Sequence, residues 1–106
     1  MLQSGRHLYV LCCCQQAIEK ALKALIVRQT GELPPRIHNL PLLAERAGVV
    51  FSEERLDFIG ELTVFYIQSR YPEEVEALAT LTTRENAEST LTVTTEITEW
   101  LFSLLK

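Results

Sequence analysis

Six side chains in this chain could bind an anionic ligand, and they fall in three short segments. They are Gln16, Lys20, Lys23, His38, Arg70 and Tyr71. The planar fork of the Arg70 guanidinium suits a phosphate group, and Lys20 and Lys23 add positive charge. The Tyr71 ring could stack on a base, and His38 could bind a phosphate or a base. These residue types predict a nucleotide or anion site if the fold brings the three segments together.

Five of these residues also have a purely structural interpretation. Arg70 falls where a helix is expected to end, and an Arg there can neutralise exposed backbone carbonyls. A ring nitrogen of His38 could bond to a helix end, while Tyr71 could close the core. Lys20 and Lys23 could belong to a solvated helix face.

The composition limits the classes of function. The chain has 106 residues, which corresponds to one domain covering residues 1–106. With ten Lys and Arg against fourteen Asp and Glu, its net charge is −4, which argues against nonspecific RNA binding. Cys12, Cys13 and Cys14 are consecutive, so on a helix they point about 100° apart and do not converge on a metal. We expect a reducing, cytoplasmic location, and no metal, cofactor or membrane partner.

The apolar periodicity predicts four helices and no strand. The expected ranges are about 6–30, 40–47, 53–70 and 84–105. Gly31 should stop the first helix, Asn39 and Ser52 should cap the second and third, and Gly48 should end the second. Residues 71–81 are expected to form a loop, since Pro72 disfavours helical geometry at Tyr71. Residues 90–98 are rich in β-branched threonines but are expected to be helical, because Leu91, Ile97 and Leu101 continue a helix-like stripe.

These elements predict an all-α, antiparallel up-and-down helical bundle with a long connection over residues 31–39. The chain ahead of Gly5 holds only a stub, so the N-terminal helix is expected to be short. Another copy of the chain could then supply part of the packing surface.

Three ordered segments resemble the pattern of HEPN domains, over residues 4–102. They are Gln15-Gln16-Ala17-Ile18-Glu19-Lys20-Ala21-Leu22-Lys23-Ala24, Pro35-Arg36-Ile37-His38-Asn39-Leu40 and Ser69-Arg70-Tyr71-Pro72. The resemblance implies a bundle of four or five helices that commonly forms a homodimer. It also implies that the domain binds a nucleotide or works beside a minimal nucleotidyltransferase, in some cases as a toxin–antitoxin pair.

One departure from the family pattern bears on catalysis. The nuclease members carry an Arg followed, after four to six residues, by a His. Here Arg70 is followed by no His, and Glu73, Glu74 and Glu76 would repel an RNA backbone. We therefore predict no catalytic residues and a non-catalytic binding module. The alternatives are a degenerate metal-independent ribonuclease that uses His38, and a purely structural interaction domain.

Overall fold

The computed structural model describes residues 2–34 and 36–105, and it describes the side chains of these residues except at positions 2–5, 72, 79 and 81. Its elements are α1 (Leu2–Thr30), α2 (Leu40–Ala47), α3 (Glu53–Gln68), α4 (Pro72–Leu81) and α5 (Arg84–Leu104), with no strand in the described ranges. The predicted all-α bundle is confirmed. Pro35, which opens the second motif, lies outside the described residues.

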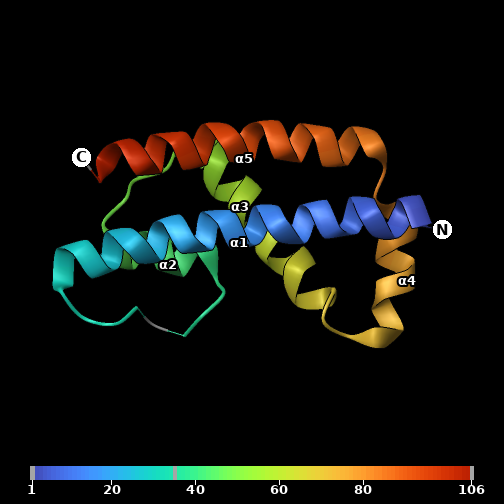
Figure 1. Cartoon of the computed structure of the whole chain (residues 1–106), viewed down its shortest axis with the longest axis horizontal. Coiled ribbons are helices and arrows are strands. Elements are labelled where there is room, and N and C mark those ends of the chain that lie inside the picture. The colour runs from blue at the N-terminus through green and yellow to red at the C-terminus, as the bar shows by residue number, and fades with distance from the viewer. Residues whose placement is uncertain (1, 35, 106) are drawn as a thin grey trace.

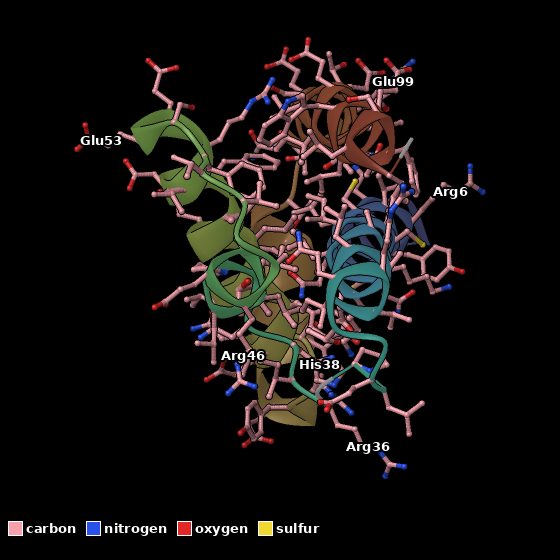
Figure 2. The ribbon with its side chains drawn as sticks, turned by 90° about the vertical axis from the view of Figure 1, so that its left-hand side faces the viewer. Arg6, Arg36, His38, Arg46, Glu53 and Glu99 are labelled. Carbon is pink, nitrogen blue, oxygen red and sulfur yellow. The ribbon has the colours of Figure 1, made fainter. Side chains whose placement is uncertain are left out.

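The helices form two layers. The long helices α1 and α5 run antiparallel, side by side, and α2 and α3 lie behind them (Figures 1 and 2). The fully buried side chains come from all four of these helices and meet between the layers. They are Ile18, Leu22, Leu40, Leu43, Ile59, Ile97 and Leu101, together with Gln15. The apolar stripes read from the sequence therefore face one common core, except that Leu91 is 51% exposed.

The helix ends follow the predicted signals. Gly31 stops α1 with a φ of 70°, and Gly48 stops α2 with the same left-handed value, which favours glycine. The Asn39 side chain accepts a hydrogen bond from the Leu42 amide, and the Ser52 side chain accepts one from the Arg55 amide. These two caps fix where α2 and α3 begin, and so where the connection over residues 31–39 ends.

The threonine-rich segment within residues 90–98 is helical, as predicted. The hydroxyls of Thr92 and Thr95 donate to the carbonyls of Glu88 and Leu91, one turn earlier. Both hydroxyls therefore have hydrogen-bond acceptors within α5. Ile97 and Leu101 are completely buried against the other layer. Burial of this apolar stripe overrides the strand propensity of the threonines.

Two boundaries differ from the prediction. Residues 72–81 form α4 instead of a loop: Pro72 occupies the first turn, where its missing N–H costs nothing, and Glu73 and Glu74 lie at the positive end of the helix dipole. Helix α1 begins at Leu2 instead of near Arg6, and Gly5 lies inside it. In the described part of the chain, no helix combines the length and the apolar character needed to cross a bilayer.

Candidate functional site

Glu19 is the centre of a polar network on α1. Only 9% of this residue is exposed. Its Oε2 accepts a hydrogen bond from Lys23 Nζ at 3.0 Å, and its Oε1 lies 2.8 Å from His38 Nδ1. Burial of Glu19 raises the pKa of its carboxyl, but the hydrogen bonds from His38 and Lys23 outweigh burial, so the pKa falls below its ordinary value of 4.5. Glu19 is therefore a carboxylate at neutral pH, held between two basic side chains.

The connection over residues 31–39 brings His38 to this carboxylate. The buried Gln15, one turn before Glu19, donates from Nε2 to the His38 backbone carbonyl at 2.8 Å. The same nitrogen lies 3.5 Å from Glu19 Oε1. Because Asn39 caps α2 at the next position, the backbone around His38 is anchored on both sides. Figure 2 shows His38 on the connection beside α1, with Arg36 directed into solvent.

The Tyr66 side chain on α3 joins the second motif to the third. Its ring centroid lies 5.7 Å from that of His38, and the guanidinium carbon of Arg70 lies 5.9 Å over the Tyr66 ring. The Ser69 hydroxyl donates to the Tyr66 carbonyl at 2.6 Å and lies 3.4 Å from the Cys12 thiol of α1. The end of α3 is thereby tied to both α1 and the connection.

All three motifs thus contribute to one group of side chains, which we call the His38–Arg70 cluster. It consists of Gln15, Glu19, Lys23, His38, Tyr66 and Arg70. Its inner part is buried, whereas 42% of the His38 side chain is exposed and Arg70 is exposed as well. The cluster is a packed polar centre with a cationic outer edge.

The structure brings together three of the six predicted site residues: Lys23, His38 and Arg70. Gln16 and Lys20 are exposed on the adjoining side of α1, and Gln16 lies one helical turn after Cys12, which contacts Ser69. Tyr71 follows Arg70 in the chain and is 53% exposed. These last three residues border the cluster, and their side chains form no hydrogen bond or ion pair with it within residues 2–34 and 36–105.

Only some of the basic side chains at the outer edge of the cluster are paired with a carboxylate. Lys23 and His38 share the Glu19 carboxylate, whereas Arg70 and Lys20 form no ion pair within residues 2–34 and 36–105. Arg70 rests on an aromatic ring, which supports a cation without neutralising it. In the same ranges, no group of three His, Cys, Asp or Glu side chains is placed to hold a metal. The Arg70 guanidinium and the Lys20 ammonium group are thus available to bind an anion.

Three members of the cluster are not among the six side chains predicted from the sequence. They are Gln15 and Glu19, which lie within the first motif segment, and Tyr66, which lies in α3. The i,i+4 spacing of Glu19 and Lys23 was a signal for their pairing. The contacts of these residues with His38 depend on how the connection and α3 return to α1, which no local pattern reveals.

The fold is a small helical bundle, and its three motif segments meet at a polar cluster beside α1, its longest helix. The HEPN domain model matches residues 1–104, so the chain belongs to the HEPN domain family. The resemblance inferred from the three motifs is confirmed. No curated protein and no solved structure gives a significant match to the chain.

Proposed function

We propose that this HEPN domain is a non-catalytic module that binds a nucleotide or another anionic ligand, and that it does so beside a minimal nucleotidyltransferase partner. The proposed ligand surface is the outer edge of the His38–Arg70 cluster, with Gln16, Lys20 and Tyr71 at its border. The observation that carries the proposal is the exposed Arg70 guanidinium, which is held over Tyr66 and has no carboxylate partner in the described ranges.

The contacts support distinct roles for these residues. Arg70 would bind a phosphate through its planar fork, and the exposed Tyr71 ring would stack on a base. Lys20 would add a second positive charge from α1. Lys23 and His38 would act mainly through Glu19, holding the connection against α1 so that the outer edge keeps its shape.

Binding without hydrolysis is favoured by the positions of the histidines. His7 and His38 are the only two in the chain, and both precede Arg70. The segment after Arg70 begins α4 with Glu73 and Glu74, whose charges would oppose the backbone of a long RNA.

Isothermal titration calorimetry with ATP, GTP and CTP tests the proposal. At least one triphosphate is expected to bind the wild type, and Arg70→Ala should weaken that binding about tenfold or more, as for loss of a charge-assisted contact. Arg46→Ala is the matched control, because it removes the same charge from an exposed position at the end of α2. Equal heats for the wild type and Arg70→Ala would contradict the assignment, and the absence of any heat would favour the purely structural interaction domain.

A ribonuclease is the second candidate, and the Glu19–His38 pair favours it. A carboxylate at Nδ1 orients an imidazole and leaves Nε2 for proton transfer. Arg70, on the neighbouring Tyr66 ring, would then bind the scissile phosphate. Incubation of the purified protein with total RNA separates the candidates: cleavage by the wild type that is abolished in His38→Ala would favour the enzyme over the binding module. Homodimerisation stays a prediction, which sedimentation velocity would check.

A further inference from the structure

An open groove separates α3 from α5. Both helices pack against α1. Within the described residues the backbones of α3 and α5 stay apart, and their side chains meet where the Arg55 guanidinium carbon lies 5.6 Å from the Trp100 ring centroid. Figure 1 shows α3 crossing behind α1 at an angle, while α5 runs along it. A hollow of about 380 Å³ lies between the two helices, with Leu11 of α1 on its floor. We call this hollow the α3–α5 groove.

The two walls of the groove have the same spacing. The α3 wall is formed by residues at positions 58, 61, 62 and 65, and the α5 wall by residues at positions 86, 89, 90 and 93. Each wall therefore presents positions i, i+3, i+4 and i+7, which form one face of a helix. Two such faces on either side of a floor are the surface into which the side chains of a third helix insert.

The walls differ in chemistry. The α3 wall is apolar apart from Glu61, with Phe58, Leu62 and Phe65, whereas the α5 wall is mostly polar, with Asn86, Ser89 and Thr90. A second hollow of about 430 Å³ shares Glu61 and Phe65 with the first and extends the apolar surface over α3. There Leu56 is 41% exposed and Val64 is 56% exposed. Together the two hollows offer an elongated, one-sided apolar surface, which is a poorer match to a small molecule than to an amphipathic helix.

The negative charge on α3 indicates which side chains should lie beside the apolar stripe of the docked helix. In α3 the acidic residues Glu53, Glu54, Asp57 and Glu61 outnumber the single Arg55. Asp57 and Glu61 line the apolar surface, and neither forms an ion pair within residues 2–34 and 36–105. A second copy that presented the same face would place these carboxylates against each other, which is unfavourable.

We propose that the α3–α5 groove docks an amphipathic helix of a protein partner, whose apolar stripe packs on the partly exposed Phe58 and Phe65 above the buried Leu62. Lys or Arg side chains beside that stripe pair with Asp57 and Glu61. Small polar residues of the helix face Ser89 and Thr90. This surface is separate from the His38–Arg70 cluster, so the proposal does not depend on the ligand assignment.

Fluorescence anisotropy with a designed peptide tests the docking. The probe is a labelled amphipathic helix of about 18 residues, five turns, with Leu at i, i+3, i+4 and i+7 and Lys on both flanks of the stripe. Two comparison peptides carry Glu in place of each Lys, or the same composition in scrambled order. The Lys peptide is expected to bind with 1:1 stoichiometry, more tightly than either comparison peptide and more weakly as salt is raised.

Two variants locate the binding on the protein. Ser89→Trp fills the groove from an exposed wall position and should weaken binding tenfold or more, whereas Thr92→Trp, on an exposed position of α5 outside the groove, should not. Glu61→Lys should weaken it about fivefold, with Glu96→Lys on α5 as the charge-matched control. Circular dichroism checks that each variant is folded.

Three results would overturn the proposal. They are equal binding of the Lys and scrambled peptides, no loss in Ser89→Trp, and no binding of the Lys peptide at all. A dimer in sedimentation velocity that Ser89→Trp converts to a monomer would also overturn it, since a second copy would then occupy the groove.

Discussion

Replacing Glu19 with Gln should destabilise the domain through the loss of two charge-assisted hydrogen bonds. The carboxylate lies 3.0 Å from Lys23 Nζ and 2.8 Å from His38 Nδ1, and its own side chain is only 11% exposed. A hydrogen bond to a charged group contributes about 1.5–3 kcal/mol. Solvent reaches 20% of the Lys23 side chain and 42% of the His38 side chain, and Gln retains one acceptor, so the expected loss is smaller. We expect the free energy of unfolding to fall by about 1–2 kcal/mol, and the Tm by roughly 5–10 °C.

The stability difference between the wild type and Glu19→Gln should become smaller as the pH falls. The pKa of Glu19 is lowered in the folded state, so its contribution to stability is fully present above the ordinary value of 4.5 and is lost as the pH falls through the folded-state pKa. Urea unfolding of the wild type and Glu19→Gln should therefore show a difference at about pH 5 that shrinks as the pH falls below 4.5. Glu99→Gln, at an exposed position of α5, is the control and should change the free energy by less than about 0.5 kcal/mol. A difference for Glu19→Gln within that limit at pH 7, or one that persists unchanged in acid, would refute the reasoning.

Three further variants probe the fold by thermal or urea unfolding. Thr63→Val removes the hydroxyl that accepts the buried Leu40 amide at 3.1 Å and should cost about 1–3 kcal/mol, and an unchanged midpoint would contradict that role. Gly48→Ala forces a side chain into a φ of 70° and should cost about 1–2 kcal/mol, whereas a stabilised variant would show that the turn relaxes. Ile97→Ala opens a cavity at a completely buried position of α5 and should cost about 2–5 kcal/mol, a loss that would be absent if the threonine-rich segment were not packed as described.

Most of the fold could be predicted from the sequence because the signals were local. Gly31, Asn39, Gly48 and Ser52 act within one helical turn of the boundary that they define. The helix α4 was missed because Pro72 was interpreted as ending a helix, although a proline followed by two glutamates is also typical of a helix start. Without a side-chain cap at Tyr71, the local pattern could not decide between the two.

The candidate site was predictable only in part, because its contacts join residues far apart in the chain. The three motif segments indicated where polar chemistry was concentrated, and His38, Lys23 and Arg70 do belong to one cluster. Glu19 and His38 are separated by 19 residues, and the Cys12–Ser69 contact spans 57. Such contacts depend on how the connection and α3 are oriented on α1, which is decided by the packing of the whole core.

The most direct test of the proposed ligand surface is a titration of the ¹⁵N-labelled domain with ATP, GTP and CTP in turn, followed by NMR chemical-shift changes. If the outer edge of the His38–Arg70 cluster binds the ligand, the amides of Gln16, Lys20, His38, Arg70 and Tyr71 will shift together and saturate at one ligand per chain. Shifts confined to another part of the surface, such as the hollow between Arg6 and Arg84, would contradict the proposed surface, as would a spectrum that ATP, GTP and CTP all leave unchanged.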